Sequence, residues 1–88
     1  MIDNINSIVE LKDYGKIKLH LDKLIAEKGI NRNILSKRID VRFEVISKWC
    51  SGTVARLDLD VLAKLCYALD CSVGDIVEYI NKEGEHHD

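Results

Sequence analysis

The sequence contains no proline and only five glycines among its 88 residues. Sandwiches and barrels need many turns, which proline and glycine usually supply, so this scarcity favours an all-α fold with short connections. No stretch approaches the ~20 consecutive apolar residues that a transmembrane helix needs. Residues 1–15 also lack the apolar run with basic flanks that marks a signal peptide. We therefore expect a cytoplasmic protein with no membrane partner.

The three cysteines and three histidines form neither a metal-binding nor a catalytic pattern. No Cys-x-x-Cys pair exists, and His86 and His87 lie in a polar tail, so we expect no metal. An odd number of cysteines among apolar residues indicates free thiols in a reduced core, with redox sensing by Cys66 or Cys71 as the alternative. Because no Ser-His-Asp, Cys-His or paired-carboxylate arrangement is present, the sequence predicts no enzyme and no cofactor. No small-molecule ligand is evident.

Charge is unevenly distributed along the chain. In total, 13 basic and 15 acidic residues give a net charge of −2, which taken alone argues against a nucleic-acid partner. Residues 31–56, however, hold six basic and two acidic residues, so this segment carries +4 and the remainder carries −6. The length and the 47% apolar content predict one small folded domain. That domain combines a basic surface with an acidic body.

Apolar residues recur at helical spacing in five segments. Asn31, Asp58 and Ser72 are expected to cap the second, fourth and fifth helices, the last with Asp75 as a capping box. Turns are expected at Gly29, Asp40 and Gly52, and the third helix spans about 43–50. The apolar stripes assigned to the five helices are, in order, Leu21, Leu24 and Ile25; Ile34, Leu35 and Ile39; Val45, Ile46 and Trp49; Leu59, Leu62, Ala63, Cys66 and Leu69; and Val73, Ile76, Val77 and Ile80.

The two ends of the chain give weaker patterns. Ile2, Ile5, Ile8 and Val9 permit a short N-terminal helix, and the alternation in residues 16–19 permits an extended segment. Residues 81–88 read as a solvated polar tail.

The second and third helices are separated by only a few residues, which predicts a helix–turn–helix unit. Five apolar side chains are expected to hold the two helices against the core: Leu35, Ile39, Val41, Ile46 and Trp49. This arrangement leaves Arg42, Phe43, Glu44, Ser47 and Lys48 on the outer face of the third helix.

Residues 29–52 resemble the helix-turn-helix of the phage Cro/CI-type repressor (xenobiotic-response-element, XRE) family. The family pattern is Gly-Leu-Thr-Gln-x-x-Leu-Ala-x-x-x-Gly-Val-Ser-x-x-x-Ile-Ser-x-x-x-x-Gly, and it aligns without gaps. Residues 57–75 resemble the two helices that follow in short members. The positions identical to the pattern are Gly29, Leu35, Val41, Ile46, Ser47 and Gly52.

The resemblance implies a compact five-helix repressor-like DNA-binding domain over residues 19–80, with residues 1–18 as an N-terminal extension and 81–88 as the tail. It also implies a sequence-specific transcriptional regulator that binds double-stranded DNA with residues 43–50 in the major groove. Because one short helix reads few base pairs, we expect a homodimer on DNA. The dimer surface would be either the fifth helix with its flank (Ile76, Val77, Tyr79 and Ile80) or the N-terminal apolar residues, which otherwise fold back on their own core. The alternative function is a protein–protein adaptor or antitoxin-like partner that retains the fold.

By the same resemblance, base contacts fall to the five outer residues of the third helix. Arg42 and Lys48 can donate to guanine, Glu44 can accept from cytosine, and Phe43 can contact a thymine methyl. The alternatives are that Phe43 packs against the second helix, that Glu44 only pairs with Lys48, and that Arg42 and Lys48 touch phosphate alone. Phosphate contacts are assigned to Asn31, Arg32, Ser51, Thr53 and Arg56, the last with an ordinary surface charge as its alternative.

The chain departs from the family pattern at a few places. Asp40 replaces the turn glycine and must tolerate a left-handed backbone, and Ser36 replaces a small alanine at the helix crossing. Ile25 and Cys50 align with a buried Arg–Glu pair of some members, and an apolar pair there is a coherent substitution.

Overall fold

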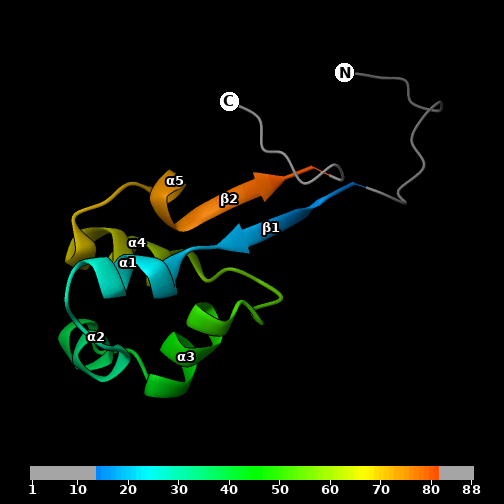
Figure 1. Ribbon diagram of the computed structural model, residues 1–88. Helices are drawn as coiled ribbons and strands as arrows, with labels where there is room; N and C mark the ends of the chain where they lie inside the picture. The colour runs from blue at the N-terminus through cyan, green and yellow to red at the C-terminus, as the bar shows by residue number, and fades with distance from the viewer. Residues whose placement is uncertain (1–13, 82–88) are drawn as a thin grey trace.

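The computed structural model describes residues 14–81, which form a cluster of short helices with a two-stranded ribbon at one side (Figure 1). The N-terminal apolar residues and the two tail histidines lie outside this range. The elements are β1 (Lys16–Leu19), α1 (Leu21–Glu27), α2 (Arg32–Ile39), α3 (Phe43–Ser51), α4 (Leu59–Leu69), α5 (Val73–Ile76) and β2 (Val77–Ile80).

The five helices predicted from the sequence are present, but the all-α prediction misses a small sheet. Strands β1 and β2 pair antiparallel, with Lys16 opposite Ile80 and Leu19 opposite Val77. The prediction that the fifth helix reaches Ile80 is wrong, because α5 ends at Ile76 and the chain continues as β2. The β-branched and aromatic residues of 77–80 favour a strand once a partner is available. That partner is β1, which lies almost sixty residues away in the sequence.

Asn31 and Asp58 cap the N-termini of α2 and α4, as predicted. The Asn31 side chain accepts a hydrogen bond from the backbone N–H of Ile34 at 2.8 Å. The Asp58 carboxylate accepts from the N–H groups of Asp60 and Val61 at 2.9 and 3.2 Å. These acceptors satisfy amides that have no partner within the first turn of a helix.

The capping box that was predicted at the start of α5 is also formed. The Asp75 carboxylate accepts from the backbone N–H of Ser72 at 2.9 Å and from its hydroxyl at 3.1 Å. These two bonds, in that order, lower the pKa of Asp75, because they stabilise its ionised form.

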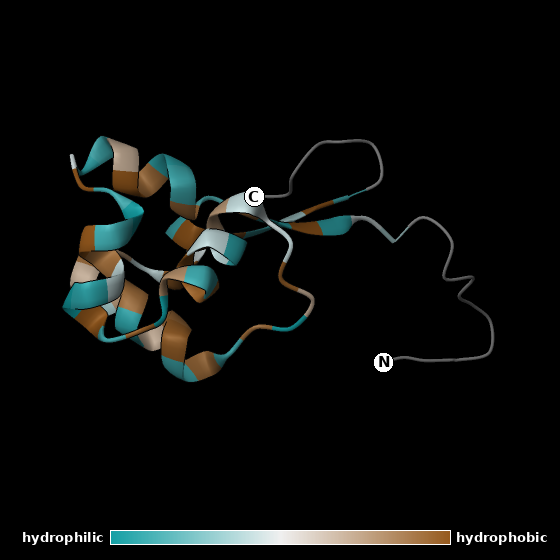
Figure 2. Ribbon diagram, turned by 90° about the horizontal axis from the view of Figure 1, so that it is seen from below, coloured by the Kyte–Doolittle hydropathy of each residue, from teal (hydrophilic) through white to brown (hydrophobic). Residues whose placement is uncertain are grey.

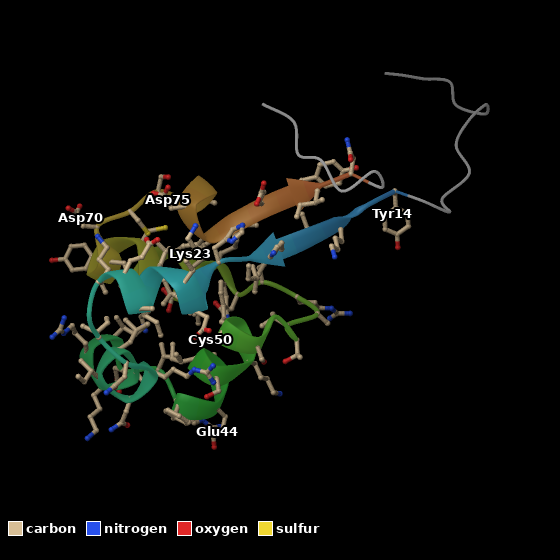
Figure 3. All side chains as sticks on the ribbon, viewed as in Figure 1. Tyr14, Lys23, Glu44, Cys50, Asp70 and Asp75 are labelled. Carbon is tan, nitrogen blue, oxygen red and sulfur yellow. The ribbon has the colours of Figure 1, made fainter. Side chains whose placement is uncertain are left out.

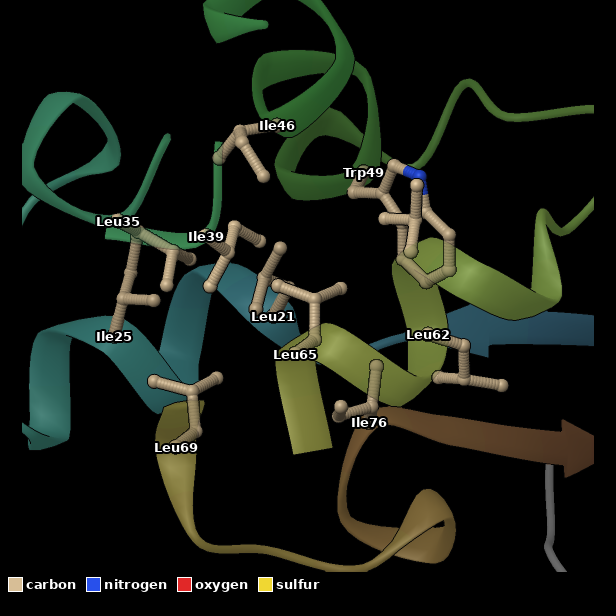
Figure 4. Packing of buried hydrophobic residues seen from close by; sticks show 11 residues of the cluster. Leu21, Ile25, Leu35, Ile39, Ile46, Trp49, Leu62, Leu65, Leu69 and Ile76 are labelled. Atoms are coloured by element: carbon tan, nitrogen blue, oxygen red, sulfur yellow. The ribbon is translucent and has the colours of Figure 1, made fainter. Parts of the chain in front are cut away.

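The core lies where α1, α3, α4 and α5 meet, with α2 closing one side (Figure 4). Leu35, Ile46 and Leu65 are fully buried, and Trp49 is 2% exposed. Each such side chain contributes ~1.5–3 kcal/mol relative to an exposed position. Figure 4 labels most of the buried set, which is Leu21, Ile25, Leu35, Ile39, Ile46, Trp49, Val61, Leu62, Leu65, Leu69 and Ile76.

The apolar stripe predicted for α4 is partly wrong. Leu59 is 75% exposed and Ala63 is also exposed, whereas Val61 and Leu65 are buried. Helix α4 is apolar on most of its circumference, so its sequence period does not decide which side faces the core. Figure 2 shows hydrophobic residues on outward-facing turns of the helices as well as between them.

The ribbon of β1 and β2 extends away from the helices (Figure 1). A hydrogen bond to a backbone carbonyl lies at each of its ends. The N–H of His20 donates to the carbonyl of Ile76 at 2.8 Å. At the far end, the hydroxyl of Tyr79 donates to the carbonyl of Tyr14 at 2.7 Å. Gly15 has φ +86°, and a Cβ there would lie 2.3 Å from the carbonyl oxygen of Ile80. Only glycine fits this close approach.

Candidate nucleic-acid interface

A left-handed residue produces the sharp turn between α2 and α3. Asp40 has φ 55° and ψ 50°, and its N–H bonds to the end of α2. The N–H of Val41 then donates to the carbonyl of Ser36 at 3.0 Å. Aspartate adopts this conformation more readily than most residues with a Cβ, so Asp40 can occupy the position where the family pattern has glycine. Val41 packs against the core and fixes the direction in which α3 starts.

Helix α3 buries one side and presents the other to solvent. Ile46 and Trp49 face the core, as predicted, while Phe43, Glu44 and Lys48 are exposed. In Figure 3, Glu44 projects from the outer end of the molecule, opposite Asp75 and α5. The five residues predicted to read bases are therefore carried by one helix and its N-cap, although Ser47 is half-buried at the margin of this face.

The structure bears on two alternatives for this face, namely that Phe43 packs against the second helix and that Glu44 only pairs with Lys48. Phe43 is 48% exposed, so about half of its surface packs on the protein and half is open. Within residues 14–81, no ion pair joins Glu44 to Lys48, although the two are one helical turn apart. Both charged groups are thus available to an external partner.

At the start of α2, the two residues predicted to touch phosphate already have protein partners. The Asn31 side-chain oxygen caps the helix, which leaves its amide nitrogen for other bonds. The Arg32 guanidinium lies 3.5 Å from the Asp22 carboxylate of α1. That distance is beyond the usual range for a strong hydrogen bond, and the Arg32 and Asp22 side chains are 38% and 63% exposed, so solvent weakens the pair. Arg32 can therefore exchange Asp22 for a phosphate at little cost.

The other three predicted phosphate contacts lie at and beyond the end of α3. The Ser51 hydroxyl is 3.2 Å from the hydroxyl of Thr53. The backbone N–H groups of Gly52 and Thr53 donate to the carbonyls of Trp49 and Lys48 at 3.3 and 3.1 Å. Arg56 is exposed in the loop that follows. The Ser51 hydroxyl also donates to the carbonyl of Lys48 at 3.3 Å. A phosphate must therefore compete with existing bonds at the two hydroxyls, whereas the exposed Arg56 guanidinium offers its charge directly.

Sequence reasoning missed a small polar group that joins α1, α2 and α3. Cys50 lies near both Asp22 and Arg32. Ile25, the other residue aligned with the family's buried Arg–Glu pair, is 3% exposed. Burial is the main reason that the pKa of the Cys50 thiol is raised, with Arg32 acting in the opposite direction and Asp22 adding to the rise. Neither spacing nor residue type marks Asp22 as a partner of Arg32, because the contact depends on how α1 and α2 cross.

The remaining predictions about chemistry concern the cysteines and the membrane. Cys50, Cys66 and Cys71 are free thiols, and all are half-buried. Over residues 14–81, no group of three or more potential metal-ligating side chains comes together. None of the helices in that range has the length and apolar character needed to span a bilayer.

Comparisons with known proteins agree with this geometry. The model of the Cro/C1-type HTH DNA-binding domain matches residues 20–82. An uncharacterised HTH-type transcriptional regulator of Bacillus subtilis strain 168, YozG, is 30% identical over 67 residues, which cover 76% of this chain and 80% of the relative. The crystal structure of the transcriptional regulator VanUg has a TM-score of 0.63 at 21% identity and covers 84% of this chain and 97% of its own. A solved protein from Bacteroides fragilis gives 0.64 at 22% identity, covering 72% of this chain and all of that one.

Proposed function

Because the chain belongs to the Cro/C1-type HTH DNA-binding domain family, we propose that it regulates transcription by inserting α3 into the major groove of a specific double-stranded operator. The observation that carries the proposal is the exposed outer face of α3. It presents aromatic, acidic and basic side chains on a helix that the core holds rigidly. Such a mixture suits base edges, which offer donors, acceptors and methyl groups.

The residues assigned to base reading are the five of the outer face. Lys48 is free to donate to guanine O6 or N7, and Glu44 is free to accept from cytosine N4. The open half of Phe43 suits a thymine methyl. Arg42, as the N-cap of α3, and Ser47, at the margin of the face, complete the set.

Phosphate binding is assigned to two segments that flank α3. Asn31 and Arg32 would contact one strand from the start of α2, and Ser51, Thr53 and Arg56 would contact the backbone beyond the end of α3. These contacts position the protein without reading sequence. Their number, ~four to six, sets the expected slope of log affinity against log salt.

A homodimer on DNA completes the proposal, since a single recognition helix reads too few base pairs for a specific site. Of the residues predicted to form the dimer surface, Ile76 is fully buried and cannot contact a second copy, whereas Tyr79 is 46% exposed. The protein would act in the cytoplasm, where its DNA lies. Sedimentation that shows a monomer at high concentration, with and without operator, would contradict the dimer.

The test begins with selection of an operator from random duplexes, followed by affinity measurements for the chosen sequence at several salt concentrations. Lys48→Ala should cost ~1–3 kcal/mol and relax preference at one base pair, whereas Arg32→Ala should weaken all sequences alike. Lys64→Ala, which removes one positive charge on α4 beside Asp60, is the control and should change neither.

Two outcomes would count against the proposal. Absent or salt-independent binding would exclude DNA and favour a protein-binding adaptor. Identical behaviour of the Lys48 and Arg32 variants would show that the assignment of base and phosphate roles is incorrect.

A further inference from the structure

We propose that Lys16 and Lys18 of β1 form an additional binding site for the DNA backbone, beside the end of α3. This inference rests on the proposed DNA-binding function and extends its surface to a strand that the family pattern over residues 29–52 does not include. Its occupant is a phosphodiester of the same duplex that α3 enters.

The placement of β1 carries the inference. A cleft of about 370 Å³ lies between β1 and the C-terminal end of α3, and it is lined by residues 16–19 on one side and 50–52 on the other. Ser51, which is assigned to phosphate, thus lies on the opposite wall from the two lysines. A backbone that runs past Ser51 and Thr53 passes next to β1. Figure 1 shows the same arrangement, with β1 adjacent to the loop that leaves α3.

The wall of this cleft that residues 50–52 form offers a phosphate no positive charge. The amides of Gly52 and Thr53 are bonded to α3 carbonyls, and the two hydroxyls near them carry no charge. A phosphate there would need cations from elsewhere. Lys16 and Lys18 are both exposed, and their flexible stems let the ammonium groups extend beyond the strand.

The strand register gives the two lysines a defined spacing. Residues two apart point to the same face of a strand and lie ~6.6–6.8 Å apart. Their cross-strand neighbours differ, since Lys16 is opposite Ile80 and Lys18 is opposite Glu78. The Glu78 carboxylate lies 2.6 Å from the His20 ring. Because an acidic neighbour weakens attraction for phosphate, Lys16 should contribute more than Lys18.

Two other lysines of the acidic body, Lys23 and Lys28, lie in different surroundings and provide a matched control. Lys23 lines a separate cleft with Glu27 and Asp75, on the α5 side of α1. Lys28 is near Asp75 and Cys71. In Figure 3, Lys23 lies on the side of α1 that faces Asp75, away from Glu44 and the outer end of α3. Removing Lys23 and Lys28 changes the net charge as much as removing Lys16 and Lys18.

The experiment compares the wild type, Lys16→Gln/Lys18→Gln and Lys23→Gln/Lys28→Gln as full chains on the selected operator over a series of salt concentrations. Each phosphate contact contributes ~0.9 to the slope of log affinity against log salt. We expect the β1 variant to lose up to about two such contacts, with unchanged base preference, and the α1 variant to keep the wild-type slope. Of the single variants, Lys16→Gln should have the larger effect. Circular dichroism checks that all variants fold.

The outcomes separate this inference from the function on which it rests. If the wild type binds the operator with a steep salt dependence and the β1 variant has the same slope, the inference is overturned and the proposed function stands. Equal losses in the β1 and α1 variants would also overturn it, because they would reflect net charge and not position. If the wild type itself shows no salt-dependent binding, the proposed function fails first.

Discussion

The helix-turn-helix unit, α2 and α3, and the terminal ribbon, β1 and β2, are held together in different ways. Leu35, Ile39, Ile46 and Trp49 are each at most 9% exposed, so buried apolar area fixes the first unit. In the ribbon, Ile17 and Tyr79 are 56% and 46% exposed, and backbone hydrogen bonds and a glycine fix the pairing. The surface to which we assign base reading is therefore supported by the core, while the surface that we assign to the flanking backbone depends on a locally stabilised strand pair.

The largest effect on stability should come from a substitution in the core that supports the helix-turn-helix unit. Ile46→Ala removes a fully buried side chain of α3, and we expect a loss of ~2–5 kcal/mol in the free energy of unfolding. Glu44→Ala, on the exposed side of the same helix, should change it by ~0.5 kcal/mol or less. Urea denaturation measures both. A difference below ~1 kcal/mol between the variants would show that α3 does not depend on this packing.

A smaller, more local effect should come from the ribbon. Gly15→Ala places a Cβ 2.3 Å from the Ile80 carbonyl at φ +86°, so the strands must separate, at a cost of ~1–3 kcal/mol. Gly29→Ala is the control, because Gly29 also has a positive φ of 74° but no atom within 4 Å of the added Cβ. Amide exchange at residues 77–80 should quicken only in the Gly15 variant, and helical content should remain. If both variants behave alike, backbone strain alone explains the result and the close contact plays no part.

The smallest effect should come from the capping box at the start of α5, the short helix that leads into β2. Hydrogen bonds from Ser72 lower the pKa of Asp75, so its stabilising contribution is present above the pKa of the unfolded carboxyl. It is lost as pH falls through the lower folded-state pKa. Asp75→Asn should therefore be less stable than the wild type near neutrality, and the difference in Tm should shrink below about pH 4. A difference that does not vary with pH would contradict the role of the charge.

The same contrast explains what the sequence could predict. The side chains of Asn31, Asp58 and Asp75 accept hydrogen bonds from amides two or three residues away, so their capping roles can be predicted from local spacing. The burial of Ile46 and Trp49 follows from the helical period. The alternation in residues 16–19 permitted an extended segment, but the pairing of residue 16 with residue 80 is not local and could not be predicted from it.

Two further features depended on tertiary packing. The sequence of α4 contains two apolar stripes at helical spacing. Only the packing against the other helices determines that Leu65 is buried and Ala63 is exposed. The proximity of Lys16 and Lys18 to Ser51 likewise follows from the ribbon, which the helical periods do not reveal. The outer face of α3, by contrast, could be predicted. The helical period identified Ile46 and Trp49 as the buried side, and the exposed side of the helix follows from it.

The antiparallel pairing of β1 with β2 also has a consequence for the order of folding. The contacts within α2 and α3 join residues close in sequence and require only short loops to close, whereas the ribbon closes a loop of about sixty residues, at a higher entropic cost. The helix-turn-helix segment also precedes β2 along the chain and is synthesised first. Strand β1, the first element of residues 14–81, can therefore pair only after β2, the last of them, has been synthesised.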